Sequence, residues 1–141
     1  MIKMPTNLFL QSVSAWKAYK GSENDKTDGH RIILVYKIDE NSFYYFTVTS
    51  QIEKAKNRSK KDISSLVELD KSEWIALTKS SCIECGKRNL KVISRSELKE
   101  LYENNKLQVL PELPKTIQDK IKRAICFSVT YTDSEKKLYT R

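Results

Sequence analysis

The sequence has little glycine, proline or cysteine, with three residues of each among 141, and it has a single histidine. So little glycine and proline excludes a low-complexity chain, and a hydrophobic fraction of 39% is too high for a disordered one. No apolar run approaches the roughly 18 residues that a membrane-spanning helix needs, and the N-terminus lacks the features of a signal peptide. We therefore expect one folded domain over residues 1–141, located in the cytoplasm and without a membrane partner.

Phosphate-binding loops and common catalytic groups are also scarce. No GxxxxGK[ST] or GxGxxG motif occurs, and His30 has no nucleophile motif beside it. The cysteines, Cys82, Cys85 and Cys126, are too few for a secreted disulfide framework and are expected to be reduced. A zinc site would need Cys126 and His30 to join Cys82 and Cys85 from distant positions, so strand packing is the favoured role of that pair. We expect no metal and no other cofactor.

Positive charge is what the sequence has in excess. It contains 26 Lys and Arg against 18 Asp and Glu, which gives a net charge of +8 and a pI of about 9.3. A surplus of this size on a small domain indicates an anionic partner, most often nucleic acid, or else a merely solvated basic surface.

The first two thirds of the chain has the pattern of β-strands. Residues 31–38 and 44–50 are rich in β-branched and aromatic side chains and are separated by the turn-prone segment 39–42, which predicts a hairpin. Further strands are expected at 12–20, 66–69, 74–78, 82–85 and 90–93. The fold class is therefore mainly β with appended helices, an α+β chain with a strongly bent antiparallel sheet.

Two helices are expected in the last third. Ser94 and Glu97 have the spacing of a capping box, and the helix that follows should end at Asn104–Asn105. Pro114 suits the start of a second helix, in which Ile117, Ile121 and Ile125 form an apolar stripe that ends near Phe127. Residues 133–141 are polar and are predicted to be a flexible tail.

The hairpin register suggests a candidate site. Turning the apolar residues of both strands toward the core places Ile38 opposite Tyr44 and Arg31 opposite Gln51. Thr49 then shares the outward face with Arg31, on a diagonal. A guanidinium beside a hydroxyl can hold a phosphate, although an ordinary pair at a strand end is the alternative.

A basic segment follows Thr49, Ser50 and Gln51. We interpret it as a mobile loop that contacts the phosphates of a polyanion, with a solvated loop as the alternative; its basic residues are Lys54, Lys56, Arg58, Lys60 and Lys61. Trp16, Tyr19 and Tyr45 are candidates for stacking on unpaired bases.

Taken in order, these segments resemble the MazF/PemK family of ribonuclease toxins. The resemblance runs from about Trp16 to Phe127 and includes Arg31-Ile32-Ile33-Leu34-Val35, Val48-Thr49-Ser50, Leu66-Val67-Glu68-Leu69 and Ser81-Cys82-Ile83-Glu84-Cys85. Matched by residue, Arg31 falls on the family's catalytic Arg and Thr49 on its catalytic Ser/Thr. Ile32 stands where the family has Pro.

The resemblance implies a small SH3-like or CcdB-like barrel that forms a homodimer and is bound by a cognate antitoxin. It implies a toxin of a toxin–antitoxin system, an endoribonuclease that cleaves single-stranded RNA without a metal, by attack of the ribose 2′-hydroxyl. Arg31 would stabilise charge and Thr49 would orient the phosphate or the 2′-hydroxyl. The homodimer would use the stripe of Ile117, Ile121 and Ile125 or the exposed sheet surface. Alternatives are a non-catalytic SH3-like module that binds nucleic acid or protein, and a CcdB-like inhibitor of a topoisomerase.

Overall fold

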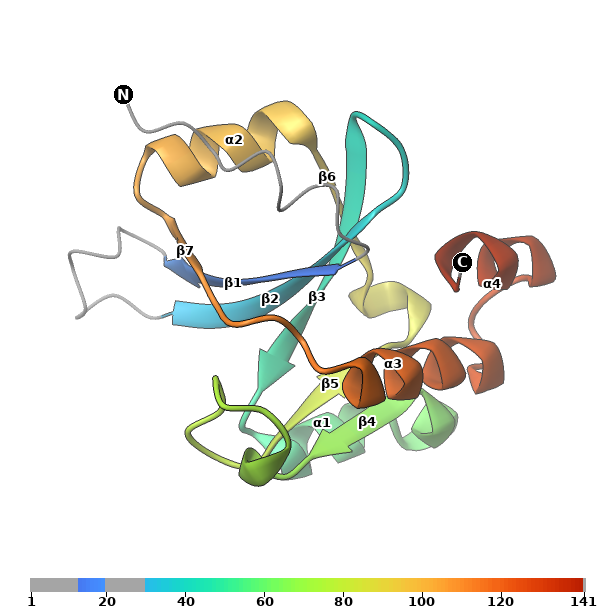
Figure 1. Ribbon diagram of the computed structural model, residues 1–141. Helices are drawn as coiled ribbons and strands as arrows, with labels where there is room; N and C mark the ends of the chain where they lie inside the picture. The colour runs from blue at the N-terminus through green and yellow to red at the C-terminus, as the bar shows by residue number, and fades with distance from the viewer. Residues whose placement is uncertain (1–12, 20–29, 141) are drawn as a thin grey trace.

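The computed structural model describes residues 13–19 and 30–140 (Figure 1). Its strands are β1 (Val13–Tyr19), β2 (His30–Lys37), β3 (Ser42–Thr49), β4 (Leu66–Leu69), β5 (Ser81–Glu84), β6 (Lys91–Ser94) and β7 (Leu107–Val109). Its α-helices are α1 (Ile52–Arg58), α2 (Arg95–Glu103), α3 (Lys115–Phe127) and α4 (Asp133–Tyr139), and its 3-10 helices are η2 (Lys60–Ser65), η3 (Lys71–Glu73) and η4 (Lys87–Asn89). None of the helices in the described ranges is long and apolar enough to cross a membrane.

The seven strands form one antiparallel sheet, in the order β4-β5-β3-β2-β1-β7. β3 has two partners on one side: its first half pairs with β6, and its last two residues pair with β5. The expected antiparallel sheet with appended helices is confirmed. Within the described residues, however, the sheet is open, with β4 and β7 at its ends, and does not close into a barrel.

The hairpin of β2 and β3 has the predicted faces but a different register. Ile33 lies opposite Thr47 and Lys37 opposite Phe43. Each residue of β2 therefore pairs with a β3 residue two positions earlier in the chain than expected. The turn is shorter because Ile38 and Asp39 both donate from their backbone N–H to the Ser42 carbonyl. A slip of two residues keeps every side chain on its face. The ladder ends at Ile32 and Val48, and continuing the same register by one residue would place Arg31 opposite Thr49.

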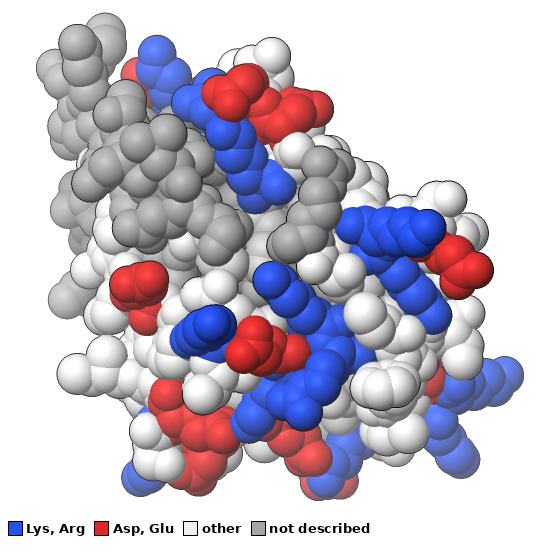
Figure 2. Space-filling model, turned by 45° about the vertical axis from the view of Figure 1, so that its right-hand side comes forward, with Lys and Arg blue, Asp and Glu red and all other residues white. Residues whose placement is uncertain are grey.

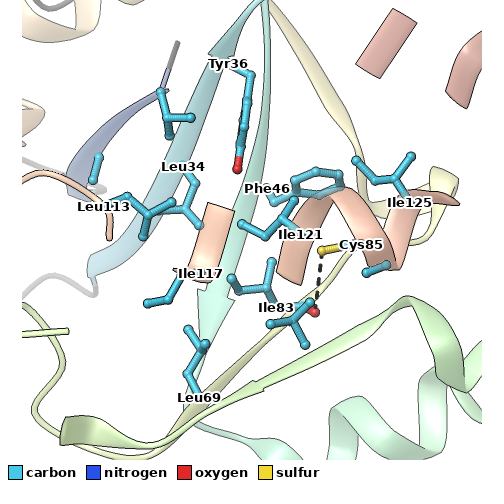
Figure 3. Close-up of a cluster of buried hydrophobic side chains, with 14 of the residues drawn as sticks. Leu34, Tyr36, Phe46, Leu69, Ile83, Cys85, Leu113, Ile117, Ile121 and Ile125 are labelled. Atoms are coloured by element: carbon cyan, nitrogen blue, oxygen red, sulfur yellow. Dashed lines mark hydrogen bonds between the residues drawn. The ribbon is translucent and has the colours of Figure 1, made fainter. Parts of the chain in front are cut away.

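The main core lies between one face of the sheet and α3 (Figure 3). Leu34 and Phe46 are fully buried on this face, and Ile117, Ile121 and Ile125 pack onto it from the helix. Burying each of these isoleucines contributes about 1.5–3 kcal/mol, so this stripe holds the helix in place. The predicted helix and its stripe are confirmed, and the stripe is used inside the molecule, at 0–1% exposure, rather than on a surface that a second copy could contact.

A second, smaller core covers part of the opposite face. Trp16 and Phe43 from the sheet pack there with Leu98 of α2 and Leu107 of β7. Trp16 has 0% exposure and meets the ring of Tyr102 edge-on at 5.7 Å. The strands β1 to β3 therefore lie between α2 and α3.

The predicted ends of α2 are confirmed, with one change at the start. Ser94 caps the helix by accepting from the Glu97 backbone N–H at 3.2 Å, but the Glu97 carboxylate accepts from the Ser94 hydroxyl instead of the Ser94 backbone. At the other end Asn105 adopts a φ of 59°, and Lys106 donates to the carbonyl of Leu101. A left-handed residue just after the C-cap, followed by a residue that donates back to a carbonyl of the last turn, is a common way for a helix to end, and Asn adopts this conformation readily.

The strand expected at 74–78 is wrong. Asp70 caps η3 with its side chain, and the chain then turns, with the Leu77 backbone donating to the Trp74 carbonyl. Trp74 is buried with the main core, and its indole N–H donates to the Glu112 carbonyl at 3.1 Å. The apolar pattern of this segment reflects that anchoring and not a strand.

The flexible tail expected at 133–141 is also wrong over its described part. Residues 133–139 form α4, capped by Thr132, whose hydroxyl accepts from the Glu135 backbone while Glu135 accepts from the Thr132 backbone. Tyr139 is buried against Tyr44 and Tyr131. A single aromatic anchor and a capping box outweigh the polar composition of the segment. The last residue, 141, lies outside the described residues.

Candidate functional site

A cleft of about 900 Å³ opens on the face of the sheet that α2 covers only in part. It lies where β3 exchanges β6 for β5 as its partner, because the chain between these two strands leaves the sheet and turns through η4. The sheet residues that line it are Ala18, Tyr19, Arg31, Ile33, Tyr45, Thr47, Val48, Thr49, Glu84 and Lys91, and the others are Ser50, Gln51, Arg58 and Asn89. Both predicted catalytic residues are among them.

Continuing the β2–β3 register one residue beyond the Ile32–Val48 pair places Arg31 and Thr49 in one row across the sheet. Ala18 pairs with Arg31, and Thr49 pairs with Cys82. Directly opposite residues in an antiparallel pair have Cβ atoms about 4.5–5.5 Å apart, so on this continued register the Arg31 and Thr49 side chains start as close neighbours. The predicted pair therefore lines one cleft, and the continued register places the two residues opposite each other instead of on a diagonal.

Within the described part of the chain, the Arg31 guanidinium makes no hydrogen bond and no ion pair, and Arg31 is exposed. The Thr49 hydroxyl accepts from the Gln51 backbone N–H at 3.1 Å, which fixes the oxygen while leaving its proton available to donate. Ser50 and Gln51 are exposed beside it, as the start of α1 turns the chain at the rim of the cleft. This end of the cleft can bind an anion through one guanidinium and at least one hydroxyl.

Arg58 also lines the cleft, but it already has an anionic partner. Its Nη2 lies 2.9 Å from Glu84 Oε2 and its Nε 3.2 Å from Glu84 Oε1, a two-pronged ion pair that raises the pKa of Arg58. The hydroxyl of Ser59 donates to the same carboxylate at 3.3 Å. Glu84 has only 12% of its side chain exposed, so the pair is a fixed part of the cleft wall. Sequence reasoning counted Arg58 as a free cation and missed Glu84.

The basic segment after Thr49 is ordered and only partly free. Residues 52–58 form α1, which buries Ala55, instead of the expected mobile loop. Lys56 pairs with Glu53 and Glu68, and the hydrogen bond to Glu68 raises its pKa. The remaining lysines, Lys54, Lys60 and Lys61, are exposed, have no ion pair with a described residue, and lie outside the lining of the cleft.

The three aromatic residues predicted to stack on bases differ in their position relative to the cleft. Trp16 is fully buried in the second core and so is not available for stacking on a base. Tyr19 lines the cleft, and its hydroxyl donates to Gln108 at 2.8 Å across to β7. Tyr45 lines the cleft as well, with one side of its ring packed on the second core.

The cysteine pair is structural. Ile83 and Cys85 belong to the main core, so Cys82, which directly precedes Ile83, faces the other side of β5 and the two thiols point to opposite sides of the sheet. Burial raises the pKa of Cys82 to about 11 and raises that of Cys85 still further. Over the described ranges, no three His, Cys, Asp or Glu side chains lie close enough to hold a metal. The strand-packing interpretation of the pair is confirmed.

Asn89 and Lys91 complete the cleft and were not predicted. Lys91 is exposed on β6 opposite Tyr45, and Asn89 ends η4 at the fork of the sheet. A lone Lys and Asn in a short polar segment carry no signal in the sequence, because only the split pairing of β3 brings them to Tyr45.

No protein-family model matches the chain, and neither a curated protein nor a solved structure matches it. The residues of the cleft therefore carry the functional assignment.

Proposed function

We propose that the protein is a toxin-like endoribonuclease that binds single-stranded RNA in the cleft and cleaves it without a metal ion. One observation carries the proposal: Arg31, which has no hydrogen bond or ion pair with a described residue, lines the same cleft as Thr49, and this cleft is large enough for a nucleotide. The same two residues fall on the catalytic positions in the resemblance to the MazF/PemK family and its SH3-like, CcdB-like fold.

In the proposed reaction the ribose 2′-oxygen loses its proton to water and bonds to the adjacent phosphorus, while the bond to the 5′-oxygen of the next nucleotide breaks and that oxygen takes up a proton from water. The products are a 2′,3′-cyclic phosphate and a 5′-hydroxyl. Arg31 stabilises the additional negative charge of the five-coordinate phosphorus, and the Thr49 hydroxyl donates to a phosphate oxygen. Arg is a poor proton donor at its ordinary pKa, so the guanidinium acts through charge and hydrogen bonds.

The test compares wild type with Arg31→Ala, Arg31→Lys and Thr49→Val on a mixed single-stranded RNA in the presence of EDTA. Loss of a group that stabilises the transition state, as in Arg31→Ala or Thr49→Val, is expected to slow cleavage by about 100-fold or more. Arg31→Lys should retain only part of the wild-type rate. Lys115→Ala is the matched control, because it removes one exposed charge from α3 on the other side of the sheet. The same sequence with 2′-O-methyl riboses should stay intact. Intact RNA with the wild type contradicts the proposal.

A second candidate function is binding of single-stranded RNA without cleavage. It is favoured by the contacts of Glu84, the single carboxylate among the described residues that line the cleft, because the side chains of Arg58 and Ser59 already bind its oxygens. Binding of the RNA without cleavage products would select this candidate. The partners implied by the family, a second copy of the chain and an antitoxin, stay predictions.

A further inference from the structure

The end of the cleft away from Arg31 and Thr49, here called the inner end, differs chemically from the end that holds these two residues. It is formed by Tyr45 of β3 and Lys91 of β6, with Asn89 of η4 two residues before Lys91 in the same lining. Tyr45 and Lys91 are directly opposite each other in the sheet, so their side chains leave it on the same face. This end therefore offers an aromatic ring, a carboxamide and an ammonium group together.

These three side chains have unused bonding capacity. Within the described residues, neither the Tyr45 hydroxyl, the Asn89 carboxamide nor the Lys91 ammonium has a hydrogen-bond partner or an ion pair. Tyr45 is half-buried, and its ring packs against the second core. A ring supported in this way, with free donors and acceptors around it, can receive a flat polar group.

The two ends of the cleft are well separated. Tyr45 and Thr49 are four residues apart on the same face of β3, which corresponds to about 13 Å between their backbones. Thr47 lies between them on the same face of the strand and also lines the cleft. A phosphate at Arg31 therefore leaves the inner end free for another part of the same ligand.

We propose that Tyr45, Asn89 and Lys91 form a subsite for a nucleobase of the single-stranded RNA, with Arg31 and Thr49 holding a phosphate of that RNA. This inference rests on the proposed function, because it assigns part of the same ligand. The base stacks on the Tyr45 ring, and the carboxamide of Asn89 hydrogen-bonds its edge with one donor and one acceptor. Lys91 donates to a base oxygen or ring nitrogen.

The experiment compares two oligonucleotides of equal length and charge that cannot be cleaved. Both have a 2′-O-methyl ribose-phosphate backbone, one with all four bases and one without bases, and their dissociation constants are measured by fluorescence anisotropy. Wild type is expected to bind the base-bearing strand about tenfold more tightly or better, since stacking of each base contributes substantially. Tyr45→Leu and Asn89→Ala should each reduce this ratio toward one and leave the affinity for the base-free strand unchanged.

Two controls separate the subsite from the phosphate end. Arg31→Ala should weaken both strands by the same factor, so that the ratio is unchanged. Asn57→Ala, which alters an exposed amide of α1 outside the cleft, should change neither affinity. If Tyr45→Leu fails to fold, Asn89→Ala still tests the subsite.

The outcomes distinguish the two proposals. Equal affinity of wild type for both strands, or a ratio that survives Asn89→Ala, overturns the subsite and leaves phosphate binding and cleavage standing. Failure of both strands to bind overturns the subsite and the proposed function together. A ratio that falls in Asn89→Ala while the matched RNA is never cleaved supports the subsite and removes only the nuclease step.

Discussion

Tyr36 and Tyr44 stack on each other in the main core, with ring centroids 4.9 Å apart and planes 8° from parallel. Their hydroxyls differ. The Tyr44 hydroxyl donates to the Tyr139 carbonyl at 2.8 Å, whereas the buried Tyr36 hydroxyl has no hydrogen-bond partner within the described residues. Burial raises the pKa of both phenols, so both are neutral at pH 7. A buried hydroxyl without a partner costs stability relative to a hydrogen atom at the same place.

Tyr36→Phe should therefore be neutral or stabilising, by up to about 1 kcal/mol, because it removes a polar atom that gains nothing from the fold. Tyr44→Phe is the matched control and should be destabilising by about 1–3 kcal/mol, because it leaves the carbonyl of Tyr139 without its donor. Urea unfolding at pH 7 measures both differences. Destabilisation by Tyr36→Phe of the same size as that by Tyr44→Phe would show that the first hydroxyl does have a partner.

At the scale of elements, the contacts that hold α4 to the body of the protein include the buried ring of Tyr139 and an ion pair of Glu135. The Lys87 ammonium lies 5.1 Å from the centre of the Tyr139 ring and pairs with Glu135. The hydrogen bond from Lys87, followed by the one from the Thr132 backbone, lowers the pKa of the Glu135 carboxyl below its ordinary 4.5. The same ion pair raises the pKa of Lys87 above 10.5.

These shifts predict how α4 depends on pH. A lowered pKa in the folded state means that the contribution of Glu135 is complete above about pH 4.5 and is lost as the pH falls through the folded value. The contribution of Lys87 is complete below about pH 10.5 and is lost as the pH rises through its own folded value. Attachment of α4 should therefore be constant between these limits and weaken on both sides.

Amide hydrogen exchange of α4, corrected for intrinsic rates, should show this loss as the pH is lowered below about 4.5. Glu135→Gln should show weaker protection already at pH 6 and a smaller change on acidification. Asp133→Asn is the control, since Asp133 lies in the same helical turn without a hydrogen bond or ion pair to a described residue, and it should keep the behaviour of wild type. An equal loss of protection in wild type and Glu135→Gln on acidification would contradict the role of the pair.

The elements that sequence reasoning predicted well are those whose signal is local. A stripe of isoleucines at four-residue spacing and a Ser cap determine α3 and α2 by themselves. The pairing of β2 with β3 was predicted on the right faces but two residues out of register, because the hydrophobic pattern repeats every second residue and the turn decides between equivalent registers.

The elements that were missed depend on contacts far along the chain. α1 and α4 are short polar helices that are stabilised by burial of Ala55 and Tyr139. The composition of these segments does not indicate that either residue is buried. For the same reason the candidate site could be predicted only at Arg31 and Thr49, which share one hairpin. Glu84, Asn89 and Lys91 reach the cleft through pairing of β5 and β6 with β3, which connects residues some 40 positions apart.

For the whole molecule, a net charge of +8 says less about binding than the positions of the unpaired cations do. On the face drawn in Figure 2, acidic side chains lie among the basic ones. Of the cations near the cleft, Lys56 and Arg58 are engaged by carboxylates. Arg31 and Lys91 line the cleft without such a partner in the described part of the chain.

The salt dependence of RNA binding should reflect this division. For a single strand, the logarithm of the affinity falls with the logarithm of the salt concentration with a slope of about −0.7 for each phosphate that the protein neutralises. Arg31→Ala removes a cation that faces the phosphate and should make the slope less negative by about 0.7. Lys56→Ala removes a cation whose charge Glu53 and Glu68 already balance, so it should leave the slope almost unchanged.

Lys91→Ala discriminates between the two ends of the cleft in the same titration. If Lys91 contacts a base, as the subsite requires, its loss should weaken binding with little change in slope, because no counterion release depends on it. If it contacts a phosphate, the slope should change by about the same amount as in Arg31→Ala. Anisotropy titrations of an uncleavable strand from 50 to 300 mM salt measure all three variants, with Lys115→Ala as the control for loss of one exposed charge. Equal slopes for Arg31→Ala and Lys56→Ala would show that net charge, and not the cleft, determines binding.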